Sequence, residues 1–225
     1  MRRNRVWIAL GLIGMLIVPA LWLSGCNFFY STETDPHIYL SFEEQEDGTY
    51  VVSGFSGKAV HNVVIPATHN EKRVTGIADD AFGCKYNGML DLSDLPLESV
   101  VIEEGITDIG STAFHDREIG SVVLPDSVTR IGDQVFSGCA ALKSITIPDS
   151  VTEIGVAAFS DCTALKKVVL GKGVKEIYAE TFRNCVSLTA ITIPAHVTEI
   201  SREAFSGCTA LTGITIPVSY THLTL

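Results

Sequence analysis

A 23-residue repeat fills most of the chain and constrains its fold more than any other feature. Three positions of the unit each recur four times in register over the second half of the sequence. They are phenylalanine at Phe136, Phe159, Phe182 and Phe205, cysteine at Cys139, Cys162, Cys185 and Cys208, and isoleucine at Ile131, Ile154, Ile177 and Ile200. A unit this short cannot bury an apolar core alone, so the repeat predicts a stack of coils, a solenoid.

Each copy divides into a strand and a return arm. Residues 142–147 have the L-x-x-L-x-L form of a leucine-rich repeat strand, and Ile145 and Ile147 alternate with Thr146. In the return arm, residues 151–159 space their apolar side chains three to five apart, which predicts a short helical turn. We therefore expect an α/β solenoid of 23-residue coils with a parallel concave sheet and helical turns on the return arm.

Corners and irregular copies can also be located. Two residues after each phenylalanine come Gly138, Asp161, Asn184 and Gly207. These residue types tolerate a positive φ, so they predict a left-handed corner. The copy at 106–125 lacks one residue after Phe114, and the copy at 74–102 carries nine extra residues around 83–95. The repeats thus extend over 60–217 with two irregular members.

The N-terminal part of the chain contains a targeting segment and a hairpin. Residues 1–5 are basic, residues 6–23 are apolar, and Leu23-Ser24-Gly25-Cys26 follows, which predicts a secretory signal over 1–25. The alternative is an uncleaved transmembrane helix near the minimum length. Residues 26–37 are expected to be a tether. The Asp47-Gly48 pair between two β-prone runs predicts a hairpin over 38–59 that caps the first coil.

Two resemblances follow from these motifs. The tetrapeptide ending at Cys26 resembles the lipobox of bacterial lipoproteins, which implies that Cys26 is the lipid attachment site. The unit A-F-x-x-C-x-x-L-x-x-I-x-I-P resembles the BspA-type (Treponema-type) leucine-rich repeats of bacterial surface proteins, and residues 63–82 are similar to that family's usual first repeat. This resemblance implies a curved solenoid with a surface role, often adhesion, and no catalytic residues.

The C-terminal residues 218–225 depart from the repeat. They resemble the adaptor-derived tails of some metagenomic reading frames, which favours a truncation artefact, whereas the alternative is a short strand that caps the last coil.

Charge and motifs narrow the function further. The chain has 16 basic and 26 acidic residues, and three of the basic ones lie in the predicted signal, so a nucleic-acid partner is not expected. Motifs such as H-E-x-x-H and G-x-S-x-G are absent from the sequence, so we predict a non-catalytic protein that has no metal site and needs no cofactor.

Two columns of chemically active side chains have structural interpretations. Stacked strands lie ~4.8 Å apart, so four cysteines in one column cannot converge on a single metal, and buried free thiols are expected. Carboxylates also share one repeat position, with Arg130 between the first two; they are Asp108, Glu153, Glu176 and Glu199. Because they recur with the repeat, we expect a solvated acidic row rather than an acid–base pair.

The outward side chains of the strands form the predicted binding surface. Their central column is Val64, Val101, Val123, Thr146, Val169, Thr192 and Thr215, beside a basic spot of Lys143, Lys166 and Lys167. Of these we predict as ligand contacts Val101, Val123, Lys143, Thr146, Lys166, Lys167, Val169 and Thr192. A β-branched column could also serve only to stiffen the sheet.

The combined prediction is a lipid-anchored, extracytoplasmic protein that binds an unknown protein or glycan at the cell surface. A structural spacer for a C-terminal domain lost by truncation is the first alternative. A fragment of an envelope enzyme is the second.

Overall fold

The computed structural model describes residues 27–30, 39–56, 62–83 and 97–215. The predicted signal, the lipid attachment site Cys26 and the tail at 218–225 lie outside this part of the chain. Within it, every regular element is a strand. No helix of the described residues could cross a membrane.

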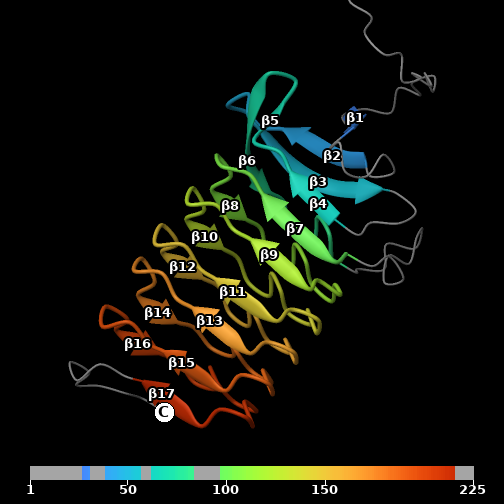
Figure 1. Cartoon of the computed structure of the whole chain (residues 1–225). Helices are drawn as coiled ribbons and strands as arrows, with labels where there is room; N and C mark the ends of the chain where they lie inside the picture. The colour runs from blue at the N-terminus through green and yellow to red at the C-terminus, as the bar shows by residue number, and fades with distance from the viewer. Residues whose placement is uncertain (1–26, 31–38, 57–61, 84–96, 216–225) are drawn as a thin grey trace, which may run out of the picture.

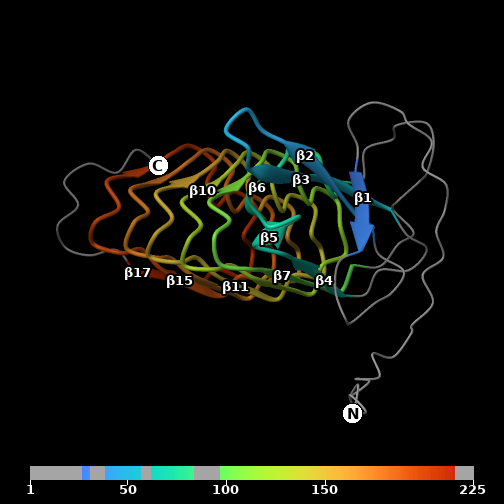
Figure 2. The same cartoon turned by 90° about the horizontal axis from the view of Figure 1, so that it is seen from above.

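The coils stack into a solenoid with two rows of parallel strands along opposite sides (Figures 1 and 2). One row, which we call the strand face, contains β4 (Asn62–Ile65), β7 (Ser99–Ile102), β9 (Ser121–Val123), β11 (Ser144–Thr146), β13 (Lys167–Val169), β15 (Ala190–Thr192) and β17 (Gly213–Thr215). The other row, the return-arm face, contains β6 (Lys72–Ile77), β8 (Asp108–Ile109), β10 (Arg130–Ile131), β12 (Glu153–Ile154), β14 (Glu176–Ile177) and β16 (Glu199–Ile200).

Repetition of residue type produces the register of both rows. Ile145 pairs with Val168 on the strand face, and Ile131 pairs with Ile154 on the return-arm face, one coil further along in each case. Ile145 and Ile147 are buried while Thr146 is exposed, which confirms the predicted alternation. The structure thus confirms the parallel strands and the 23-residue coils of the predicted solenoid.

A ladder of stacked phenylalanine rings forms the centre of the core. It contains Phe55, Phe82, Phe114, Phe136, Phe159, Phe182 and Phe205. Neighbouring ring centres are 5.0 to 5.6 Å apart, within the range of favourable offset stacking. Because each ring contacts the rings of the coils before and after it, the core is continuous along the solenoid.

The predicted helical turns of the return arm are absent from the described residues, and this expectation was wrong. A helix needs backbone bonds within its own segment, but here the amides bond to the next coil. Phe136 N donates to Ala158 O at 2.8 Å, and Phe159 N donates to Thr181 O at 2.9 Å. Ala157, two residues before Phe159, has a φ of 53°, which a right-handed helix does not allow. Apolar spacing of three to five residues also fits the corners of a flat coil.

The predicted left-handed corners are confirmed. Gly138, Asp161, Asn184 and Gly207 have φ values of 74°, 59°, 56° and 75°. At Gly138 an added Cβ would lie 1.9 Å from a carboxylate oxygen of Asp116, so this position also requires glycine for space. Asn184 fills its corner by donating to Asp161 Oδ1 at 2.8 Å.

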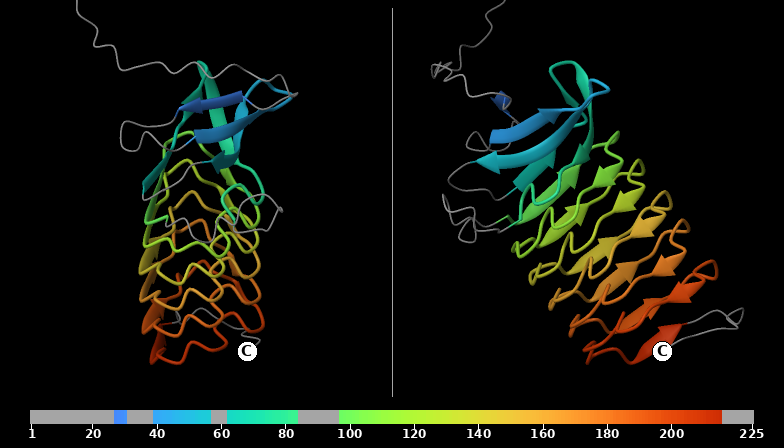
Figure 3. Two further views of the ribbon diagram at one scale, coloured as in Figure 1. Left: turned by 90° about the vertical axis from the view of Figure 1, so that its right-hand side faces the viewer. Right: turned by 180° about the vertical axis from the view of Figure 1, so that it is seen from behind.

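The N-terminal hairpin is joined to the solenoid (Figure 3). It consists of β2 (Tyr39–Glu44) and β3 (Tyr50–Ser56), which pair antiparallel. β3 also pairs in parallel with β6 and contributes Phe55, the first ring of the ladder. β5 (Thr68–His69) pairs with β6, and β1 (Asn27–Tyr30), inside the segment expected to be a tether, pairs with β2.

In the coil that lacks one residue, Arg117 occupies the repeat position that cysteine fills in the four later coils. It is 1% exposed, and its guanidinium carbon lies 5.3 Å from the centre of the Phe55 ring. This contact has the geometry of a cation–π interaction. It links the shortened coil to the hairpin.

Candidate binding surface

The predicted outward column is solvent-exposed in the folded chain. Val101, Val123 and Val169 are 37%, 55% and 41% exposed, although valine is usually buried. Thr146, Thr192 and Thr215 are also exposed, whereas Val64 is half-buried. The strand face therefore offers solvent a row of β-branched side chains.

The three lysines of the basic spot lie together beside this column. All three are exposed, and Lys166 N donates to Lys143 O at 2.9 Å, which places these two residues side by side in consecutive coils. Lys167 begins the next strand position, opposite Ser144. Within the described residues none of the three forms a salt bridge, so their ammonium groups are available to an anionic ligand.

A groove of about 550 Å³ lies between β13 and β15. One side is formed by residues 166–170, and the other by residues 189–192 and Pro194. Four predicted contacts line it; they are Lys166, Lys167, Val169 and Thr192. Lys167 begins β13, whereas the equivalent positions of the next two coils carry Ala190 on β15 and the exposed Gly213 on β17, so the side chains at this position become smaller after β13.

The structure places the remaining four predicted contacts in two different parts of the strand face. Lys143 and Thr146 belong to the coil before β13, and Thr146 pairs with Val169 in the ladder. Val101 and Val123 are paired on β7 and β9, away from the groove. Sequence reasoning identified the lysines and the column, but it did not identify the groove.

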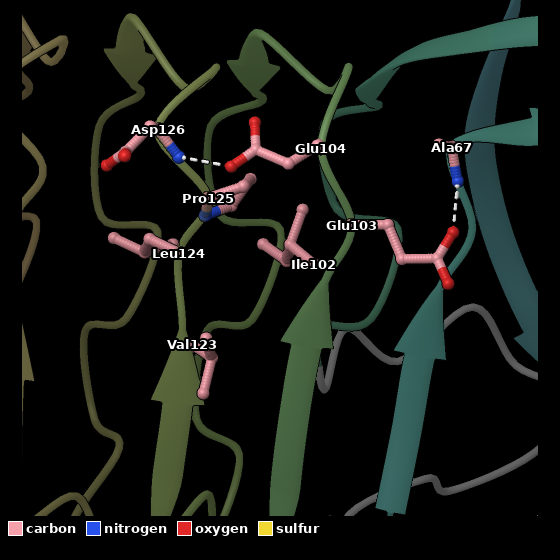
Figure 4. A pocket seen from close by; sticks show the side chains of 8 residues that line it. All are labelled: Ala67, Ile102, Glu103, Glu104, Val123, Leu124, Pro125 and Asp126. Carbon is pink, nitrogen blue, oxygen red and sulfur yellow. Dashed lines mark hydrogen bonds between the residues drawn. The ribbon is translucent and has the colours of Figure 1, made fainter.

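A second hollow of about 610 Å³ lies at the carboxyl ends of β4, β7 and β9 (Figure 4). Its carboxylates bond to the backbone of neighbouring coils. Glu103 accepts a hydrogen bond from Ala67 N at 2.8 Å, and Glu104 accepts one from Asp126 N at 2.9 Å. These acidic groups tie successive linkers together, so we assign them a structural role.

The cysteine column consists of free thiols, as predicted, and Cys139, Cys162 and Cys185 are buried. Each thiol donates to a phenylalanine carbonyl of the preceding coil, for example Cys162 Sγ to Phe136 O at 3.1 Å. Burial raises the pKa of the Cys162 thiol to about 12 and raises that of Cys139 as well. A thiol with a raised pKa is a poor nucleophile, because the thiolate is the reactive form.

The carboxylate row lies in the return-arm strands and is open to solvent. Arg130 Nη1 lies 3.3 Å from Asp108 Oδ1, and Arg130 Nε lies 3.5 Å from Glu153 Oε2. All three side chains are between 39% and 48% exposed. This geometry agrees with a solvated row.

Comparison with known proteins identifies the family. The model of the BspA type leucine rich repeat region matches residues 92–212 with six copies. This chain belongs to the BspA-type leucine-rich repeat family. None of the curated proteins compared with it gives a match.

Solved structures of bacterial leucine-rich repeat proteins resemble the BspA-type chain. The T. pallidum leucine-rich repeat protein is 28% identical, with a TM-score of 0.70 and 78% of each chain covered. A leucine-rich cell surface protein of Faecalibacterium prausnitzii is 30% identical, with a TM-score of 0.56; 82% of this chain and 53% of that one are covered. A Bacteroides ovatus leucine-rich repeat protein is 25% identical, with a TM-score of 0.56 and coverage of 90% and 55%. The chain therefore spans about half the length of the last two.

Proposed function

We propose that this BspA-type protein is a lipid-anchored surface protein that binds a protein or glycan through the strand face. The observation that carries the proposal is the exposed valine and threonine column beside three lysines that form no salt bridge with any residue the structure describes. Apolar side chains next to unpaired positive charge are suited to a partner with apolar and acidic groups. The F. prausnitzii relative is described as a cell surface protein, which supports the proposed location at the cell surface.

The size of the strand face predicts weak binding. With strands ~4.8 Å apart, its seven strands form a strip ~29 Å long, and three residues per strand give it a width of ~10 Å. That is roughly 300 Å², whereas a standard interface buries ~800 Å² on each partner. We therefore expect a weak complex unless loops at the rim of the solenoid also contact the partner.

Charge reversal tests the proposed surface. We expect Lys143→Glu, Lys166→Glu and Lys167→Glu together to lower binding to host-matrix proteins or acidic glycans by about tenfold or more, since like charge opposes an acidic partner. Salt should weaken the wild-type complex, because it screens the attraction between the lysines and an acidic partner. Solid-phase binding across a salt series measures both effects.

A second triple variant controls for net charge. Lys72→Glu, Arg73→Glu and Arg202→Glu make the same charge change at exposed positions outside the strand face. This variant should bind like the wild type. Equal losses in the two variants would contradict a site on the strand face, and unchanged binding in the first would favour the spacer interpretation.

The lipid anchor is tested at Cys26. We expect Cys26→Ala to release the protein from membranes or to leave an uncleaved precursor, because the acyl chains that hold it would be missing. Cell fractionation with immunoblotting measures this, and Cys84→Ala is the matched control. If Cys26→Ala fractionates and migrates like the wild type, the protein is not anchored at this residue.

A further inference from the structure

Within the described solenoid, one junction between coils lacks strand pairing in both rows of strands. At four other junctions a return-arm amide bonds to the preceding coil at 2.8 Å; the pairs are Gly110 to Ile77, Gly132 to Ile109, Gly155 to Ile131, and Ser201 to Ile177. Among the described residues the corresponding bond from Tyr178 to Ile154 is missing, and β12 is not paired with β14. On the strand face, β13 and β15 lie side by side without a ladder. β9 and β11 also lack a ladder, but the return-arm strands of that junction, β8 and β10, are paired. We call this junction the seam.

The contacts that do cross the seam gather near the phenylalanine ladder. Phe159 N donates to Thr181 O at 2.9 Å, and Asp161 N donates to Arg183 O at 2.8 Å. The rings of Phe159 and Phe182 are stacked with their centres 5.6 Å apart. The two coils are thus bonded along the turn side, while the ladders of both strand rows are interrupted.

Tyr178 gives a steric reason for the seam. The equivalent positions in the three preceding coils are Gly110, Gly132 and Gly155, and the backbones approach closely there. A Cβ added at Gly155 would lie 2.5 Å from Asp133 N, closer than atoms can pack. Ser201, one coil later, carries a small side chain at this position and still bonds to Ile177 O at 2.8 Å. Tyr178 carries a large ring there, so we attribute the lost bond to the size of its side chain rather than to its Cβ alone.

Lys175 removes a second connection at the same junction. In other coils a threonine hydroxyl at this position donates to the preceding coil. Thr152 Oγ1 donates to Thr129 O at 3.3 Å, and Thr198 Oγ1 donates to Lys175 O at 3.2 Å. Lysine has no hydroxyl, so the series of threonine hydrogen bonds between coils ends at Thr152 and begins again with Thr198, one coil after Lys175.

The linker before the seam is drawn toward the preceding coil. It reads Gly171-Lys172-Gly173, where the neighbouring linker reads Pro148-Asp149-Ser150. A Cβ at Gly171 would lie 2.1 Å from Pro148 O, and one at Gly173 would lie 2.3 Å from Val151 O. Lys172 N and Nζ both donate to Asp149, at 2.9 and 2.6 Å. The linker at 171–173 thus lies close to the preceding coil, while the strands β12 and β14 that follow in the two coils are not paired.

We infer that the seam is a hinge of the solenoid and that its opening sets the width of the groove between β13 and β15. The groove lies across the seam, because residues 166–170 belong to one coil and residues 189–192 to the next. In a repeat protein each coil contacts only its neighbours, so a weakened junction opens locally. The control of ligand binding by this opening rests on the proposed function, whereas the hinge does not.

The chain itself supplies the variant that should close the hinge. Residues 148–155 read PDSVTEIG, and residues 171–178 read GKGVKEIY. Five substitutions make the second segment identical to the first; they are Gly171→Pro, Lys172→Asp, Gly173→Ser, Lys175→Thr and Tyr178→Gly. The reverse graft, which places GKGVKEIY at 148–155, should create a seam one coil earlier.

Hydrogen exchange of single amides, followed by NMR on the full chain, tests the inference. In the wild type the amides of Lys175 and Tyr178 should exchange at least about tenfold faster than those of Thr152 and Gly155, because no ladder protects them. The closing graft should remove this difference, and the reverse graft should transfer it to residues 152 and 155. Equal protection at all junctions of the wild type would overturn the hinge, even if neither graft folds.

Binding to matrix proteins and acidic glycans separates the two proposals. If the hinge controls the groove, the closing graft should change affinity at least about threefold, while the lysine triple variant lowers binding by about tenfold or more. If hydrogen exchange follows the expected pattern but neither the wild type nor any variant binds a ligand, the hinge is supported and the proposed function is contradicted. Exchange as expected with equal affinity in the graft and the wild type would overturn control of the groove by the hinge.

Discussion

Phe159→Ala should lower the free energy of unfolding by about 3–5 kcal/mol, the usual range for truncating a large core aromatic. The ring is 0% exposed and stacked between Phe136 and Phe182, with centres 5.4 and 5.6 Å away. Its removal would leave a cavity that the backbone cannot close, since both neighbouring coils are held by their own rings. Denaturant unfolding followed by circular dichroism measures the change.

An exposed apolar residue provides the control for this prediction. Val186 is 40% exposed, so Val186→Ala should change stability by less than about 0.5 kcal/mol. A loss below about 1 kcal/mol in Phe159→Ala would show that the ring ladder is not the centre of the core.

Gly155→Val should be the other strongly destabilising change, by about 3 kcal/mol, at the upper end of the cost of overpacking. A Cβ at Gly155 would lie 2.4 Å from Asp133 Oδ1 and 2.5 Å from Gly132 C. A backbone atom is not the flexible end of a side chain, so the two coils must separate. Thermal and denaturant unfolding both report this loss.

Gly213→Val is the matched control, because an added Cβ there meets nothing within 4 Å. This variant should unfold like the wild type to within about 0.5 kcal/mol. Similar losses in the two variants would mean that the packing at position 155 does not limit the distance between coils.

The repeat made much of the fold predictable. Ile145, Ile147 and Thr146 alternate as a half-buried strand requires, and the residue types at 138, 161, 184 and 207 matched their positive φ values. The return arm was not predictable in the same way. Its apolar spacing fits both a helical turn and a cornered coil, and the choice depends on amides such as Phe136 N that bond to another coil.

The candidate site was predictable only at the level of residues. Lys166, Lys167 and Thr192 followed from their repeat positions, because outward positions recur with the strand. The groove depends instead on departures from the repeat. Tyr178 in place of glycine and Lys175 in place of threonine are visible in the sequence, but their effect appears only where two coils must approach each other.

The most direct test of the account asks which side of the solenoid meets the partner. A single cysteine is placed at Thr192, on the strand face, or at Thr152, on the return-arm face, with Cys84 and Cys208 changed to serine. Both threonines are exposed, so maleimide-linked polyethylene glycol can be attached to either. We expect the polymer at 192 to abolish binding to the matrix proteins or glycans that the unmodified chain binds, and the polymer at 152 to leave binding intact. Loss of binding from position 152 with binding retained at position 192 would contradict a binding surface on the strand face.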